Sequence, residues 1–348
     1  MRTRRPVAAL AAAALALPLA VTALSGPATA NPASTPNGPY VQCGLQPVVL
    51  NGLLSNDQLQ QELDRLEATR GDVVSVEEIG RSVEDRPLHA VTVGTGPRTL
   101  VVQTQIHGDE PIGTEAAVQL LKNVSAPTPA AQEVRDAVTL VVLPRLNPDG
   151  WERYNRDDWA SGIDPRRNSH NVDLNRTFGP SDQDMSLAPE SAAVQDFLRD
   201  LQPELVLDYH HQVTYGTADG DMVTMSLMWG THPDVPTEVA DTGKRAVSVI
   251  ADGASRNGHA TVTLYPQSDT ATTARNGLSL EGIPSLLIEQ RGQQEAGQKS
   301  AGALTKEALT SMESVLDSFT DGGFDSVDPE SAFDLPERGD RIRTSCKE

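Results

Sequence analysis

Residues 99–110, with the sequence TLVVQTQIHGDE, decide the fold and point to a site. Residues 99–106 are rich in apolar and β-branched side chains, which is typical of a strand buried on both faces of a parallel sheet. The strand ends in a polar turn that places His107 three residues before Glu110. An imidazole and a carboxylate at this spacing can meet one small cation, and ligands bind at the carboxyl ends of such strands.

Strands and helices alternate on both sides of this stretch. The order predicts an α/β fold, a single domain with a mixed, mostly parallel central sheet covered by helices on both faces. Residues 147–189 are polar and without clear periodicity, and so long a loop is usually functional. The predicted strands are 73–79, 88–93, 99–106, 138–143, 204–209, 259–265 and 285–288, and the predicted helices are one capped by Ser55 and 112–124, 190–201, 237–256, 271–281 and 301–319.

The composition excludes several classes of function. The 348 residues carry a net charge of −20, and 38% are hydrophobic, as in a globular protein. A nucleic-acid-binding protein or a protein that docks on anionic lipid would present a basic surface instead. With only 2 cysteines, the chain is neither a disulfide-dense module nor a cysteine-built zinc module. Metal ligands must therefore come from histidine and carboxylate side chains.

The first 30 residues have the features of a secretory signal peptide. A basic start precedes an apolar, alanine-rich stretch at 7–24, and residues 28–30 (ATA) form a small-residue cleavage site. A membrane anchor is the alternative, but Pro18 and the cleavage site disfavour it. We expect a secreted, extracellular protein with no membrane attachment after cleavage. Whether export follows the general or the twin-arginine route stays open.

Two segments flank the predicted domain, which covers residues 55–320. Residues 31–54 form a proline-rich, extended N-terminal segment, and residues 321–348 form an acidic C-terminal tail. Cys43 lies in the first and Cys346 in the second. Export would allow these cysteines to pair, so we expect one disulfide that joins the two segments. Two free thiols are the alternative.

A zinc site that does chemistry needs three protein ligands and an open position. The strand predicted at 204–209 delivers two candidates for the third ligand, His210 and His211, to the same edge of the sheet. Because side chains alternate along a strand, only one of these two histidines faces the site.

Short motifs between residues 80 and 289 point to a known family. They are GRSVEDRPL at 80–88, IHGDE at 106–110, NPDG at 147–150, RRN at 166–168, VDLNR at 172–176, PE at 189–190, DYH at 208–210, GIP at 282–284 and IE at 288–289. In this order they resemble the motifs of the zinc carboxypeptidase (carboxypeptidase A/B-like) metallopeptidases, of the secreted bacterial type. Asp85 and Asn171 depart from the pattern, because they stand where the family usually has glycine.

The resemblance implies one zinc ion per chain, bound by His107, Glu110 and His210 rather than His211. Two histidines and one glutamate form a recognised catalytic zinc set. Helix-borne zinc motifs of the form H-E-x-x-H or H-x-x-E-H are absent from the sequence.

The resemblance also implies three residues that act beside the metal. Glu289 would be the general base. Arg166 would stabilise the oxyanion, with Arg167 as its rival if the motif slips by one residue. Asp173 would accept a hydrogen bond from a zinc-bound imidazole and fix its orientation.

Substrate-binding residues follow from the same resemblance. Asn175 and Arg176 match the pair that clamps the terminal carboxylate of the substrate, and a planar guanidinium suits that role. Tyr265 is the nearest candidate for the family's substrate tyrosine. The residue at the base of the specificity pocket is either Ala274 or Arg275, so the side-chain preference stays open.

The implied function is that of a secreted zinc metallocarboxypeptidase. It would hydrolyse peptide bonds at the C-termini of peptide substrates that have a free carboxylate, act as a monomer and bind no nucleic acid. Two alternatives keep the same zinc site, a peptidoglycan stem-peptide hydrolase and a deacylase-type amidohydrolase. A third is a non-catalytic binding protein with this fold, which would be expected to lose Glu289 or a ligand. Neither is missing from the sequence.

Overall fold

The computed structural model describes residues 52–156, 160–180, 185–256, 261–291 and 301–342. The predicted signal peptide lies outside the described residues, as do Cys43 and Cys346. The disulfide between these two cysteines stays a prediction.

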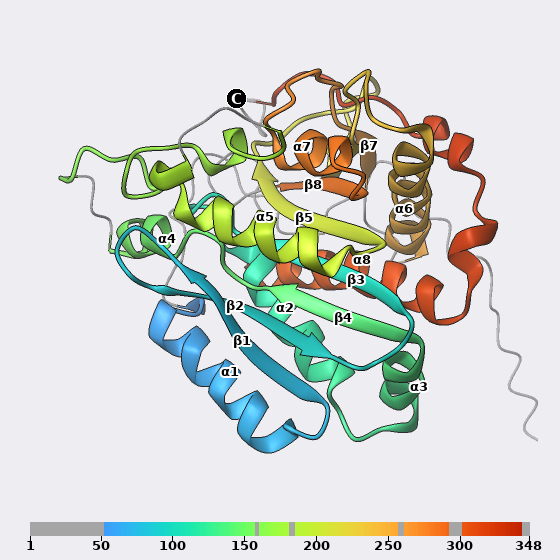
Figure 1. Cartoon of the computed structure of the whole chain (residues 1–348). Helices are drawn as coiled ribbons and strands as arrows, with labels where there is room; N and C mark the ends of the chain where they lie inside the picture. The colour runs from blue at the N-terminus through green and yellow to red at the C-terminus, as the bar shows by residue number, and fades with distance from the viewer. Residues whose placement is uncertain (1–51, 157–159, 181–184, 257–260, 292–300, 343–348) are drawn as a thin grey trace, which may run out of the picture.

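A mixed eight-stranded sheet forms the centre of the domain (Figure 1), and its strand order is β1-β2-β4-β3-β5-β8-β6-β7. The four central strands, β4, β3, β5 and β8, are parallel to one another. Antiparallel pairing occurs towards the edges, between β1 and β2, β2 and β4, and β6 and β8. The strands are β1 (Val74–Arg81), β2 (Pro87–Val93), β3 (Arg98–Thr104), β4 (Val138–Leu143), β5 (Leu205–Gln212), β6 (Met225–Trp229), β7 (Val262–Leu264) and β8 (Ser285–Arg291).

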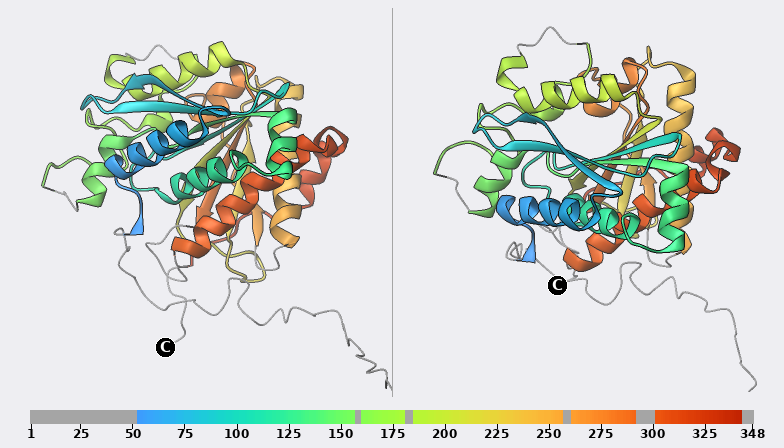
Figure 2. Two further views of the ribbon diagram at one scale, coloured as in Figure 1. Left: turned by 90° about the horizontal axis from the view of Figure 1, so that it is seen from below. Right: turned by 60° about the horizontal axis from the view of Figure 1, so that its bottom comes forward.

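Helices cover both faces of this sheet, as predicted (Figure 2). Helices α1, α2, α6 and α8 contribute to one hydrophobic core, and α5 and α7 contribute to a second core on the opposite face. The helices are α1 (Asn56–Arg70), α2 (Ile112–Val124), α3 (Pro129–Ala137), α4 (Pro148–Asn155), α5 (Pro189–Leu201), α6 (Thr237–Arg256), α7 (Ala274–Leu280) and α8 (Ala301–Thr320).

Strand β3 shows why residues 99–106 are so apolar. Leu100 and Val102 point into the core under α2 and α8, and Val101 points into the core under α5. All three side chains are completely buried. Burying each one stabilises the fold by about 1.5–3 kcal/mol. A strand that alternates between two cores has no polar face, so its sequence reads as a continuous apolar run.

Helices α3 and α4 and strand β6 were not predicted. Helix α3 buries only Ala131 and Arg135, so it shows almost no apolar periodicity. Every residue of β6 is buried, which removes the alternation that marks a half-exposed strand. Helix α4 lies within the stretch 147–189 that we expected to be a loop. The sequence did carry a signal for the start of α4, since an asparagine followed by a proline is typical of a helix N-terminus. In the structure the Asn147 side chain caps the helix by accepting from the Gly150 amide, and Pro148 is its first residue.

The acidic segment after the last helix packs against the domain as far as residue 342. Phe324 and Ala332 are buried in the core that α6 and α8 line. The Leu264 amide donates to the Pro336 carbonyl at 2.8 Å, which extends the edge strand β7. The part of this segment that the structure describes is therefore a cover over α6 and the edge of the sheet. None of the described helices is both long and apolar enough to cross a membrane.

Helix α7 packs closely against the chain at residues 178–179, and this contact gives a test of the fold. A Cβ added at Gly277 would lie 2.6 Å from both the Gly179 nitrogen and the Phe178 carbonyl carbon. We expect Gly277→Ala to lower the free energy of unfolding by about 1–3 kcal/mol, because backbone must move to admit the methyl group.

The matched control is Gly302→Ala in α8, where an added Cβ meets nothing within 4 Å. There alanine should stabilise the helix, by up to about 1 kcal/mol. Urea denaturation measures both variants. Equal stabilities of the two variants would contradict the close packing of α7.

Candidate metal centre

The predicted ligands lie together because the parallel strands that carry them have their carboxyl ends on the same side of the sheet. Strand β3 leads into the turn that carries His107 and Glu110, and β5 carries His210 close to its carboxyl end. Strand β8 carries Glu289, which is the register partner of His210. Adjacent parallel strands therefore bring residues that are far apart in the sequence to one place.

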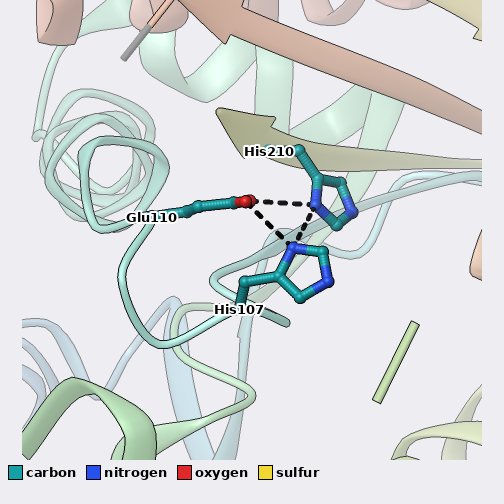
Figure 3. A group of neighbouring side chains, drawn as sticks. All are labelled: His107, Glu110 and His210. Atoms are coloured by element: carbon teal, nitrogen blue, oxygen red, sulfur yellow. Dashed lines mark hydrogen bonds and ion pairs between the residues drawn. The ribbon is translucent and has the colours of Figure 1, made fainter. Parts of the chain in front are cut away.

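Three side chains converge at this place (Figure 3). The His107 and His210 Nδ1 atoms lie 3.0 Å from each other, and each lies 3.0 Å from an oxygen of the Glu110 carboxylate. The side chains are almost completely buried, and their ligand atoms all lie within 4.8 Å of one another. Two imidazoles and a carboxylate that face one point form a donor set that suits zinc.

A second carboxylate lies behind each imidazole. Asp173 Oδ1 is 3.2 Å from His107 Nε2, and Asp208 Oδ2 is 3.0 Å from His210 Nε2. When Nε2–H donates to these carboxylates, the Nδ1 lone pairs are free to face the centre. This arrangement is usual for histidines that bind metal. Asp208 was part of the DYH motif, but its role follows only from the contact with His210.

The charges in the buried cluster favour the binding of a positive charge. Burial opposes ionisation of Glu110, but His107 and His210 still hold the pKa of its carboxyl well below the ordinary value. Burial also disfavours charged His210, yet Asp208 and Glu110 raise the pKa of that imidazole well above its ordinary value. A bound divalent cation would supply this charge without protonating the ligands. The residues present therefore fit a zinc ion.

Arg166 lies beside this donor set, and its neighbour Arg167 does not. The Arg166 Nη1 atom donates to Glu110 Oε1 at 3.1 Å, and its Nε atom lies 3.4 Å from Asp173 Oδ2. Arg167 instead donates to the Asn171 carbonyl at the surface. The geometry thus favours the first of the two arginines.

The unpredicted helix α4 holds the loop that carries Arg166. The Asn147 side chain donates to the Arg166 carbonyl at 3.2 Å, and Arg153 Nη2 donates to the Arg167 carbonyl at 2.9 Å. Asn171 in the same loop has a φ of 61°, and Asp85 in the β1–β2 turn has a φ of 62°. These are the two positions where the family pattern has glycine, and both Asn and Asp tolerate the left-handed conformation.

Glu289 points to the same site from β8. One of its oxygens, Oε2, is buried and has no hydrogen-bond partner in the described part of the chain. Burial is the main reason that the pKa of Glu289 rises, to about 7. A carboxyl group tuned near neutral pH can both take and give a proton, which is the property of a general acid–base residue.

Asn175 and His211 connect the site to the neighbouring helices. Asn175 Nδ2 lies 3.5 Å from His210 Nε2, while its Oδ1 accepts from the Ala274 amide at the start of α7. The His211 amide donates to Glu110 Oε2, and its Nε2 accepts from the Ile112 amide at the start of α2. Burial lowers the pKa of His211 to about 4, so this ring is neutral.

The other two predicted substrate residues are Arg176 and Tyr265. Arg176 is exposed and donates to the Asn175 carbonyl at 2.7 Å. Tyr265 follows β7, and its ring is flanked by two guanidinium groups. The Arg338 group lies 4.3 Å from the ring centroid and the Arg275 group 5.4 Å from it. Tyr265 thus lies against Arg275 in the first turn of α7.

Sequence comparison connects this arrangement to known proteins. A profile described as zinc carboxypeptidase matches residues 59–279. The chain is 30% identical to carboxypeptidase SOL1 of Arabidopsis thaliana over 165 residues, which cover 43% of this chain and 32% of that protein. It is also 30% identical to human carboxypeptidase D over 135 residues, or 35% of this chain and 10% of that protein. The matched region thus spans a third or less of these relatives.

Structural comparison finds the same fold. A metallo-carboxypeptidase from Burkholderia cenocepacia aligns with a TM-score of 0.62 at 19% identity, covering 78% of this chain and 70% of that chain. A metallo-carboxypeptidase from Pseudomonas aeruginosa aligns with a TM-score of 0.58 at 17% identity, covering 76% and 69%. Because the profile match includes most of the domain and all three residues of the histidine–glutamate cluster, the chain belongs to the zinc carboxypeptidase family.

Proposed function

We propose that this protein is an exported zinc metallocarboxypeptidase that removes C-terminal residues from peptides. The observation that carries the proposal is the meeting of His107, Glu110 and His210 beside Glu289, which is in register with His210 and has a buried Oε2 atom. Family membership supports this reading. A zinc ion held by these three side chains would supply a Lewis acid that polarises a carbonyl oxygen and lowers the pKa of water.

The protein's own groups would perform the remaining tasks. Glu289 takes a proton from the attacking water at its Oε2 atom, which no described residue hydrogen-bonds, and returns a proton to the leaving amine. Arg166 donates to the carbonyl oxygen as negative charge develops on it. It stays protonated there, since the nearby Glu110 and Asp173 carboxylates outweigh burial and raise the pKa of its guanidinium.

The carboxylate clamp is assigned to Asn175 and Arg176. The Asn175 amide nitrogen lies next to His210, while its oxygen is already occupied by the Ala274 amide. The amide group therefore presents a donor towards the site, which suits a carboxylate ligand. Arg176 is exposed beside it and adds a guanidinium, which binds carboxylates in a bidentate manner.

The proposal is tested with zinc-loaded protein and a panel of N-blocked dipeptides and stem peptides that differ in the C-terminal residue. Release of the C-terminal amino acid from dipeptides supports the proposal. Cleavage of stem peptides alone would favour the peptidoglycan hydrolase, which has the same zinc site. Absence of turnover on every substrate would contradict the proposed hydrolase and favour a binding protein.

The clamp predicts a strong preference for a free C-terminus. Replacing the terminal carboxylate of a substrate by an amide should lower kcat/KM about 10–100-fold, because a charge-assisted hydrogen-bonded pair is lost. The measurement compares each acid and amide pair in wild type and in Arg176→Ala.

In Arg176→Ala the acid should lose most of its advantage over the amide. The matched control is Arg167→Ala, which removes a guanidinium that points to the surface and should keep the wild-type ratio. Equal cleavage of acid and amide by the wild-type protein would show that no carboxylate clamp operates.

A further inference from the structure

Arg275 lies in the first turn of α7, next to the residues assigned to the substrate clamp. The amide of the preceding residue, Ala274, donates to Asn175 Oδ1 at 2.7 Å, which fixes the start of α7 beside the site. The Arg275 side chain is only 4% exposed. Its guanidinium carbon lies 5.4 Å from the centre of the Tyr265 ring. The helix thus places a buried cation against Tyr265, one residue after the contact with Asn175.

This guanidinium is only partly paired. Its Nη2 atom donates to the Pro266 carbonyl at 3.2 Å. Its Nη1 atom is buried and has no hydrogen-bond partner in the described ranges of the chain. Buried polar atoms are nearly always paired, so this nitrogen, which lies beside the residues of the proposed clamp, is available to a ligand that can supply the partner.

The charges around Arg275 indicate what kind of ligand fits. Burial lowers the pKa of Arg275 to about 10, so the group is still charged at neutral pH. The opposite charge of Glu289 and the like charge of Arg176 both act on it. Glu289 is the proposed base, and an anionic ligand would pair the guanidinium without using that carboxyl group. Arg176 is already assigned to the terminal carboxylate of the substrate.

We propose that Arg275 binds a carboxylate on the side chain of the C-terminal substrate residue, so that the enzyme selects acidic C-terminal residues. The inference rests on the proposed function and adds the substrate class to it. A substrate with two carboxylates would pair Arg176 and Arg275 at once. A neutral side chain would leave the buried Arg275 nitrogen unpaired, and a basic side chain would be repelled. Glutamate, aspartate and diaminopimelate all carry this second carboxylate.

The test compares N-blocked dipeptides that end in glutamate or glutamine, which have nearly the same shape and differ in charge. For the zinc-loaded wild-type protein, kcat/KM should favour glutamate about tenfold or more. In Arg275→Gln this ratio should fall to near one. In Arg275→Lys, which keeps the charge but lacks the planar fork, the ratio should be intermediate. A wild-type ratio near one would overturn the inference.

The control variant is Arg199→Gln, which removes a guanidinium that pairs with Glu281 at the opposite end of α7. It should keep the wild-type preference for glutamate. If Arg275→Gln also kept that preference, another group would recognise the side chain and the assignment of Arg275 would be wrong. The wild-type ratio decides on acidic selection even if an Arg275 variant does not fold.

Equilibrium binding separates this inference from the proposed hydrolysis. Calorimetry on zinc-loaded Glu289→Gln should show that the glutamate peptide binds about tenfold tighter than the glutamine peptide. Tighter binding without turnover by the wild-type protein would support Arg275 as the anion-binding group and contradict the hydrolase. Cleavage of both peptides without any preference would support the hydrolase and contradict the role of Arg275. A third peptide, ending in diaminopimelate, shows which source of the second carboxylate is preferred.

Discussion

Replacing Glu289 by glutamine is expected to lower kcat about 10²–10⁴-fold while zinc binding is retained. Glutamine has nearly the same shape as glutamate but cannot take a proton from water. Glu289 is not among the three clustered donors, so the metal content should not change. The measurements are steady-state kinetics on the preferred dipeptide and the zinc content of the purified variant.

The control for this prediction is Glu133→Gln, which removes an exposed carboxylate on α3, a helix that carries none of the candidate site residues. It should have wild-type kcat and KM. A Glu289→Gln variant that retained wild-type turnover would show that another group acts as the base. A variant that lost zinc as well as turnover would instead assign Glu289 to the metal centre.

Removal of zinc is expected to abolish turnover, and this is the largest effect that we predict. A chelator should reduce activity below detection, and added Zn²⁺ should restore it. Mg²⁺ should not restore it, because it prefers oxygen ligands in octahedral geometry and the cluster offers two nitrogens. Zinc should also raise the Tm, since a ligand that binds only the folded state stabilises it.

Two histidine variants give the matched comparison. His210→Ala removes one of the clustered donors and should lose both zinc and activity. His170→Ala removes an exposed imidazole near the Leu187 carbonyl and should keep both. Full activity of zinc-free protein, with the metal content measured, would contradict the metal mechanism.

The sequence predicted the fold because its central strands are buried on both sides. The run at residues 99–106 has no polar face, so its position in a parallel sheet could be inferred without knowing its neighbours. Elements outside the central parallel strands gave less information. Helix α3 and strand β6 lack any contrast between a buried and an exposed face, and that contrast is what periodicity detects.

The site was predictable where strand ends define it. His107 and Glu110 follow β3, and His210 lies near the carboxyl end of its parallel neighbour β5, so their meeting follows from topology. Arg275 was not predictable in this way. It lies in a helix of 7 residues, which is too short for an apolar pattern to show its buried face. The sequence named Ala274 and Arg275 as alternatives, and the contacts of α7 were needed to choose between them.

His210 and Glu289 are paired across the neighbouring strands β5 and β8, so their spacing does not depend on the loops of the protein. Adjacent strands lie about 4.8 Å apart whatever loops join them, so backbone hydrogen bonds set the spacing between the proposed metal ligand and the proposed base. Arg275, which we propose selects the substrate, lies on a short helix instead. Segments that choose the substrate can therefore be exchanged between related enzymes, or grafted by design, while the spacing that supports the chemistry stays the same.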